Sequence, residues 1–161
     1  MHGPRGAGQA VPPPRRPDGG NRMFSHVMVG ARDLARLGAF YDAVLAPLGF
    51  QRRREGEEDG GPPGIGWTAP GTRAPTFFVQ EPFDHRPASA GNGCMVAFLA
   101  PSPEAVREAH AAGLAAGGAD EGAPGERPRY GRGYHGAYLR DPEGNKLHVV
   151  HRGDLAVAAE G

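Results

Sequence analysis

The 161-residue sequence contains one cysteine, one lysine and one tryptophan, and its 18 basic residues balance its 18 acidic residues. With Cys94 alone, no disulfide can form within the chain, so a reducing compartment is expected and the cytoplasm is the natural choice. A net charge of zero gives no electrostatic basis for binding nucleic acid or an acidic membrane surface. No apolar run approaches the roughly 20 residues of a membrane-spanning helix, so we expect no membrane segment.

The two ends of the chain differ in composition from the middle. Residues 1–22 contain five prolines, five glycines and four arginines but almost no large apolar side chain. Such a segment buries too little surface to offset the entropy of ordering, so we expect a disordered tail. Met23 follows directly and is an alternative start of the natural protein. Residues 154–161 are expected to be a frayed tail.

The first half of the remaining chain has the pattern of a strand, a helix and three strands. Residues 24–30 alternate in a β-rich run and predict a strand. Asp33 is a candidate N-cap, and apolar residues at helical spacing predict a helix over residues 33–46. Residues 50–54 are a candidate short strand, followed by a charged loop rich in glycine and proline. A turn with a strand on each side completes this half, at residues 65–69 and 75–80.

The second half repeats this order. Residues 94–100 predict a strand, and Ser102 predicts the start of a helix over residues 102–116. Residues 119–132 are expected to be irregular. When Asp33 is laid over Ser102, the strands and the apolar stripes of the two helices stay in register. We therefore predict two modules, at residues 23–82 and 93–153.

The second half ends in a predicted β-hairpin. Two runs rich in aromatic and β-branched residues flank the segment Asp141–Pro142–Glu143–Gly144–Asn145. Its proline presets φ and its glycine supplies a positive φ, as tight turns require. Alternation in the second strand puts His148 on one face and Leu147 and Val149 on the other. We expect the apolar pair to pack in a core and His148 to line a cavity.

Three motifs complete the pattern: His26–Val27–Met28–Val29, Gly93–Cys94–Met95–Val96–Ala97–Phe98 and the hairpin segment through Asn145–Lys146–Leu147–His148. Together with the paired modules, they resemble the vicinal oxygen chelate superfamily, which includes glyoxalase I, bleomycin-resistance proteins and extradiol dioxygenases. The resemblance implies an α+β fold, in which two βαβββ modules form curved mixed sheets around a cup-like cavity with the helices on the outer faces. It also implies a homodimer that binds a small molecule.

Enzymes of this superfamily hold one divalent metal, such as Zn, Ni, Mn or Fe, with two histidines and one or two carboxylates. By position, the resemblance puts the first-strand ligand on His26, the fifth-strand ligand on Met95 and the last-strand ligand on His148. The fourth-strand ligand falls within residues 77–81, on Gln80 or a neighbour. A thioether is a soft ligand that does not suit these metals. The metal site implied by His26, His148 and Gln80 is therefore incomplete.

Several candidate ligand-binding residues have a structural alternative. His26 is either a metal ligand or a strand histidine hydrogen-bonded in a polar cavity, and His135 either touches the ligand or packs with Tyr130, Tyr134 and Tyr138. Tyr138 and Arg140 share a face and could grip an anionic or carbonyl group, although an arginine beside a turn is often only solvated. Trp67 and Phe78 could form an apolar surface beneath the ligand, or they could belong to the core. The full candidate set is His26, Met28, Trp67, Phe78, Met95, His135, Tyr138, Arg140 and His148.

Two functional hypotheses follow from these residues. The first is a glyoxalase/bleomycin-resistance-like protein with an incomplete metal site, which binds a small organic ligand in the cup. The alternative is a divalent-metal-dependent lyase or dioxygenase of the glyoxalase I or extradiol dioxygenase kind, in which the metal polarises a carbonyl or enediolate oxygen. A metal analysis of the untagged protein separates the two.

Overall fold

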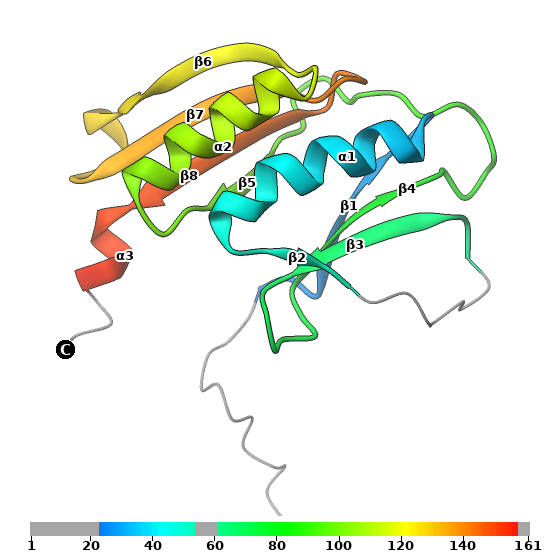
Figure 1. The fold of residues 1–161 in the computed structure, drawn as a ribbon, viewed down its shortest axis with the longest axis horizontal. Helices are drawn as coiled ribbons and strands as arrows, with labels where there is room; N and C mark the ends of the chain where they lie inside the picture. Colours follow the sequence, from blue (N-terminus) through cyan, green and yellow to red (C-terminus); the bar gives the residue numbers. More distant parts are fainter. Residues whose placement is uncertain (1–22, 54–60, 158–161) are drawn as a thin grey trace, which may run out of the picture.

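The computed structural model describes residues 23–53 and 61–157. The tail expected at residues 1–22 and part of the loop expected between residues 55 and 64 lie outside the described residues. The described chain forms an α+β fold with two four-stranded mixed sheets (Figure 1). None of its helices is long and apolar enough to cross a membrane.

The first sheet and its helix form module one. The sheet has the order β1-β4-β3-β2, with β1 parallel to β4 and the other pairs antiparallel. The helix α1 begins after Asp33, whose side chain accepts a hydrogen bond from the backbone N–H of Arg36, as the N-cap prediction requires. The elements are β1 (His26–Gly30), α1 (Leu34–Leu45), the short 3-10 helix η1 (Ala46–Leu48), β2 (Gln51–Arg52), β3 (Gly64–Thr68) and β4 (Thr76–Gln80).

The second sheet repeats this topology and forms module two. Its order is β5-β8-β7-β6, with β5 parallel to β8. Ser102 caps α2 through a hydrogen bond from the N–H of Ala105. The elements are β5 (Val96–Leu99), α2 (Pro103–Ala115), β6 (Ala119–Glu126), η2 (Pro128–Tyr130), β7 (Tyr134–Arg140), β8 (Lys146–Arg152) and α3 (Gly153–Val157). The predicted α+β fold with two βαβββ modules is confirmed.

The structure corrects three details of the prediction. Residues expected to be irregular form the edge strand β6, which the sequence conceals because Ala119–Glu126 is rich in glycine and lacks alternation. This strand pairs with β7 through shifts in register, so tertiary pairing overrides its weak β propensity. The strand expected over residues 94–100 begins at Val96, which leaves Met95 just ahead of β5. Within the expected frayed tail, residues 154–157 belong to the short helix α3, and residues 158–161 lie outside the described residues.

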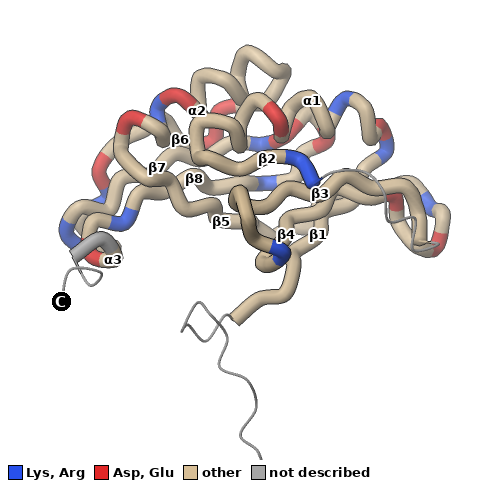
Figure 2. Tube along the Cα trace, turned by 60° about the horizontal axis from the view of Figure 1, so that its bottom comes forward, with Lys and Arg blue, Asp and Glu red and all other residues tan. Residues whose placement is uncertain are grey.

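Both long helices cover the same side of the molecule, and the two sheets lie side by side beneath them (Figures 1 and 2). The core lies between these layers, where Phe40 of α1, Val106 of α2, Val79 of β4 and Leu139 of β7 are fully buried. We call the sheet face that points away from the helices the open face. Because the two open faces lie next to each other, one chain does not wrap them around a closed cup.

The hairpin turn of module two is tied to module one. Both carboxylate oxygens of Glu143 accept backbone hydrogen bonds at the start of α1, from Arg32 at 2.8 Å and from Asp33 at 2.7 Å. Asp141, which is 3% exposed, accepts a hydrogen bond of 2.9 Å from the hydroxyl of Tyr41 on α1. Asn145 adds a longer contact, 3.4 Å, to the carbonyl of Gly30. The Asp-Pro-Glu-Gly-Asn turn therefore fixes module two against the helix start of module one.

Candidate functional site

The open face of module one is largely apolar around His26. The imidazole is exposed, with Nδ1 3.2 Å from the hydroxyl of Ser25, and its ring lies edge-on to Phe78 with centroids 5.9 Å apart. Met28 lies two residues along β1 on the same face and is 51% exposed. The alternation of β1 predicts that His26 and Met28 share a face, and the pairing of β1 with β4 adds Phe78 to them.

Gln80 does not lie beside His26. The parallel register pairs His26 with Thr76 and Gly30 with Gln80, which places Gln80 four residues further along the sheet, or about 13 Å. The side-chain amide of Gln80 donates a hydrogen bond of 2.8 Å to the carbonyl of Pro62. The sequence did not fix the register of β4, and in the observed register Phe78 pairs with Met28 and its ring contacts the imidazole.

Trp67 lies on the helix side of the sheet and belongs to the core. It is 2% exposed, its ring packs against Tyr41 and Phe77, and its indole N–H donates to Asp42 at 2.9 Å. Of the two roles weighed for Trp67, contact with the ligand and packing in the core, the structure shows the core role. Its side chain does not line the face that carries His26.

The open face of module two carries a stack of three rings, which we call the tyrosine–histidine stack: Tyr138, His148 and Tyr134. The His148 ring lies 4.2 Å from Tyr138 at an interplanar angle of 10°, and 5.9 Å from Tyr134 at 30°. Gly136 makes room for it, because a Cβ built on Gly136 would clash with Nε2 of His148. His148 is consequently only 2% exposed, although it lies on the open face.

Burial controls the charge of His148. Desolvation, with smaller contributions from Arg127 and Lys146, lowers its pKa from 6.5 to about 4. Its Nε2 has no hydrogen-bond partner among the described residues. The imidazole is therefore neutral at physiological pH, and its edge is enclosed by the fold.

Charged side chains flank the stack. Glu121 of β6 pairs with Arg140 at 2.5 Å and with Lys146 at 3.5 Å, and Arg140 also donates to the carbonyl of Gly144. The Lys146 ammonium lies 5.5 Å from the centre of the Tyr138 ring. Tyr138 and Arg140 thus share a face as expected, but Arg140 is already engaged in an ion pair.

His135 lies on the helix side of the sheet, away from His148. It pairs across the strands with His151, whose Nδ1 donates to the carbonyl of Ala100 at 3.2 Å. Desolvation and then the nearby Arg107 lower the pKa of His135. The structure therefore separates His135 from the stack formed by its neighbour Tyr134.

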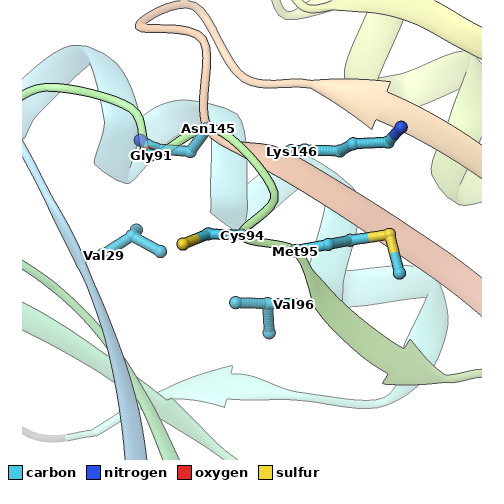
Figure 3. A pocket seen from close by; sticks show the side chains of 7 residues that line it. All are labelled: Val29, Gly91, Cys94, Met95, Val96, Asn145 and Lys146. Atoms are coloured by element: carbon cyan, nitrogen blue, oxygen red, sulfur yellow. The ribbon is translucent and has the colours of Figure 1, made fainter.

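A small pocket lies between the modules (Figure 3). Val29 of β1 lines one side, and the other side is lined by Val96 at the start of β5 and by Cys94 and Met95 just ahead of it. Met95 is 45% exposed, and the Cys94 thiol is free. Of the predicted site residues, Met95 lines this pocket, whereas His26 and His148 do not.

The candidate metal ligands do not converge within one chain. His26 lies on β1, Gln80 lies at the far end of β4, and His148 lies in the other sheet within its stack. In the part of the chain that the structure describes, no three His, Cys, Asp or Glu side chains are placed to hold a metal ion. The residues present in one chain therefore do not fit the metal site that the superfamily implies.

Three residues of the module two surface were missing from the candidate set. Tyr134 completes the stack, Gly136 makes room for it and Glu121 neutralises the neighbouring cations. Period-2 alternation in β7 puts Tyr134 and Gly136 on the same face as Tyr138, so strand parity offered a signal for these two. Glu121 gave no such signal, because β6 was not expected to be a strand.

Comparisons with known proteins agree with this architecture. A family model described as the Glyoxalase/Bleomycin resistance protein/Dioxygenase superfamily matches residues 23–149. A crystal structure of a glyoxalase/bleomycin resistance protein from Albidiferax ferrireducens T118 is 41% identical, with a TM-score of 0.69 and coverage of 81% of this chain and 99% of that chain. A search among curated protein sequences finds no match.

More distant structures share the fold alone. A family enzyme from Burkholderia phytofirmans PsJN is 23% identical, with a TM-score of 0.58, over 79% of this chain and 96% of that one. A lactoylglutathione lyase from Agrobacterium tumefaciens is 20% identical, with a TM-score of 0.55, over 82% and 94%. The family match across most of the chain shows that it belongs to the Glyoxalase/Bleomycin resistance protein/Dioxygenase superfamily.

Proposed function

We propose that this protein binds a small organic molecule on the open faces of its modules without relying on a divalent metal. The tyrosine–histidine stack is the observation that carries this proposal. The resemblance to the superfamily puts the last-strand metal ligand on His148, yet the His148 ring lies between two phenol rings and is 2% exposed. A metal-bound imidazole directs one nitrogen at the ion and usually anchors the other with a hydrogen bond. In this chain the imidazole instead supports an aromatic surface.

Metal analysis of untagged protein tests this proposal. Protein purified in the presence of Zn²⁺, Ni²⁺, Mn²⁺ or Fe²⁺ and then dialysed against a chelator should hold far less than one ion per chain. The reason is that a catalytic zinc site needs about three protein ligands, and the candidate ligands do not converge within one chain. One ion per chain that survives the chelator would overturn the proposal and favour an enzyme.

We also propose that the binding site is completed by a second copy of the chain. The strands β1 and β5 are edge strands, and their open faces carry the exposed side chains of Met28 and Leu99, which are 51% and 54% accessible. Exposed apolar side chains on edge strands are typical of surfaces that pair with another chain. Light scattering across micromolar concentrations should show a dimer, and a monomer throughout would contradict this step.

A metal-dependent lyase or dioxygenase is the second candidate function. His26 favours it, because this exposed imidazole on the open face remains accessible to an ion or a substrate. In a dimer, further ligands could come from the second copy. Replacing His26 with Ala would then abolish turnover and metal binding together, whereas a metal-independent binding protein would keep its affinity for organic ligands to within a few-fold.

The reducing environment of the cytoplasm suits this chain. Cys94 is a free thiol on an exposed segment. An exposed thiol persists most readily where glutathione and thioredoxin keep it reduced. Fractionation of cells should therefore recover the protein with the cytoplasmic fraction.

A further inference from the structure

We propose that the ligand held at module two is an organic anion, one that presents a carboxylate, phosphate or similar oxyanion to the tyrosine–histidine stack. This inference rests on the proposed binding of a small molecule at the open faces, and it adds the charge of that molecule. The charges and the hydrogen-bond donors around the stack carry it.

Positive charge exceeds negative charge around the stack. Among the described residues of this surface, the cations are Arg127, Arg140, Lys146 and Arg152, and the carboxylates are Glu121 and Asp154. Glu121 is shared between two cations, and Asp154 pairs with Arg152 at 2.6 Å. In the part of the chain that the structure describes, Arg127 donates only to the backbone carbonyls of Ala123 and Glu126, which carry no net charge. The surface thus retains positive charge, and Figure 2 shows basic positions along module two close to α3.

The cations lie at both ends of the stack. The ammonium of Lys146 is 5.5 Å from the Tyr138 ring at one end, and the guanidinium of Arg152 is 6.0 Å from the Tyr134 ring at the other. A ligand that approaches the exposed edges of the rings therefore meets a cation on either side. An oxyanion in such a position gains charge-assisted hydrogen bonds, which are stronger than neutral ones.

The two phenols of the stack are suitable donors for an oxyanion. Neither hydroxyl of Tyr134 or Tyr138 has a hydrogen-bond partner among the residues that the structure describes. Burial is the first cause that raises the pKa of Tyr134, so this phenol stays protonated at neutral pH. Neutral His148 between them adds no competing charge. Phenol donors between two cations bind carboxylate or phosphate oxygens and disfavour an ammonium group.

Three probes with one ring system separate ligand charge from ligand shape: 2-naphthoate, 2-naphthamide and 2-naphthylmethylammonium. Calorimetric titration of the full-length protein at low ionic strength should show naphthoate binding at least about tenfold more tightly than the ammonium probe, with the amide between them. The difference should shrink in 0.5 M NaCl, because salt screens half-exposed charges. An ammonium probe that binds as tightly as naphthoate, or more tightly, would overturn the inference.

Two substitutions move the expected affinity in opposite directions. Lys146→Met should weaken naphthoate binding about fivefold, and Glu121→Gln should strengthen it by a similar factor, because Glu121 neutralises Lys146 and Arg140. Arg36→Gln is the matched control for Lys146→Met. Arg36 is exposed on α1 on the helix side, and its replacement removes one positive charge, as the replacement of Lys146 does. Glu121→Gln tests the inference even if Lys146→Met fails to fold.

The outcomes distinguish this inference from the proposal on which it rests. If all three probes bind equally and the substitutions change nothing, the small-molecule function stands and the anionic ligand is wrong. If none binds up to millimolar concentration, the proposed small-molecule function is contradicted, and the inference falls with it. Charge-ordered binding that follows Lys146 and Glu121 but not Arg36 supports both.

Discussion

The two modules share one backbone plan but present different open faces. The equivalent strands β3 and β7 each place a glycine under a ring from the neighbouring strand, Gly66 under Phe78 in module one and Gly136 under His148 in module two. Phe78 is half-buried beside the exposed His26, whereas His148 is enclosed by two tyrosines. Module one thus offers an apolar, accessible surface, and module two offers a filled aromatic stack with charges around it.

This difference shows that two modules with the same topology can keep similar cores while their open faces carry different side chains. The cores of both modules follow the same rule, with apolar side chains between helix and sheet. The open faces are free of this packing requirement, so substitutions there change chemistry without changing topology. The turn at Asp141 and Glu143 joins the modules, which keeps the two different faces next to each other.

The largest expected effect comes from breaking the connection between the modules. Asp141 is 3% exposed and accepts hydrogen bonds from Tyr41, from the backbone N–H groups of Glu143 and Asn145, and from the Asn145 side chain. Asp141→Ala leaves these buried donors unpaired and should lower the free energy of unfolding by about 3 to 4 kcal/mol. Urea denaturation followed by circular dichroism measures this loss. Asp33→Ala, which removes only a helix cap, is the control and should cost about 1 kcal/mol.

A loss of less than about 1 kcal/mol in Asp141→Ala would contradict the role given to the turn. In that case the Glu143 hydrogen bonds and the core packing between the modules, which includes the contact of Phe77 with Phe98, would hold them together without Asp141. Tyr41→Phe removes one of the donors and should have an intermediate effect.

The second prediction uses pH to separate the modules. The pKa of His148 is lowered to about 4 in the folded chain, while the unfolded chain has the ordinary value near 6.5. Between these values the unfolded state binds more protons, so stability is full above pH 6.5 and falls as the pH drops towards 4. The expected contribution of His148 to this loss is about 2 to 3 kcal/mol.

His148→Phe provides the control, because it installs the residue found at the equivalent position in module one. Other groups still titrate in this variant, so the relevant quantity is the difference between the two pH profiles of unfolding free energy. The wild type should lose more stability than the variant between pH 6.5 and 4. Parallel profiles would show that His148 does not titrate in this window.

The third prediction compares the two glycines. Gly136→Ala should destabilise the protein by about 2 kcal/mol, because the new methyl group clashes with an imidazole that two tyrosines hold in place. In Gly66→Ala the new Cβ would lie 2.8 Å from the edge of Phe78, a half-buried ring that can turn aside. We expect a cost of about 0.5 kcal/mol there. Equal costs in thermal or urea unfolding would mean that the stack is no more rigid than the module one surface.

The sequence predicted the framework of this protein better than its site. Helix caps at Asp33 and Ser102, and the alternation of β1 and β8, specify local geometry directly, and the structure confirms them. The register between β1 and β4 depends on long-range pairing, so the position of Gln80 relative to His26 was not available from the pattern. Strand parity placed His148 on the open face, but it did not reveal that neighbouring tyrosines would enclose the ring.

The smallest expected change in stability concerns the exposed apolar side chains of β1 and β5. Met28 and Leu99 are 51% and 54% exposed, so replacing either with Ser removes little buried surface from one chain. Each substitution should change the unfolding free energy by no more than about 0.5 kcal/mol at a protein concentration low enough for light scattering to show a single chain. The same substitutions should weaken the proposed dimer at least tenfold in sedimentation experiments, because each removes apolar area from the paired edges. Leu114→Ser on α2, which is 40% exposed on the helix side, should leave self-association unchanged. If Leu114→Ser disrupts the dimer as much as Leu99→Ser does, the open faces are not the surface through which two chains meet.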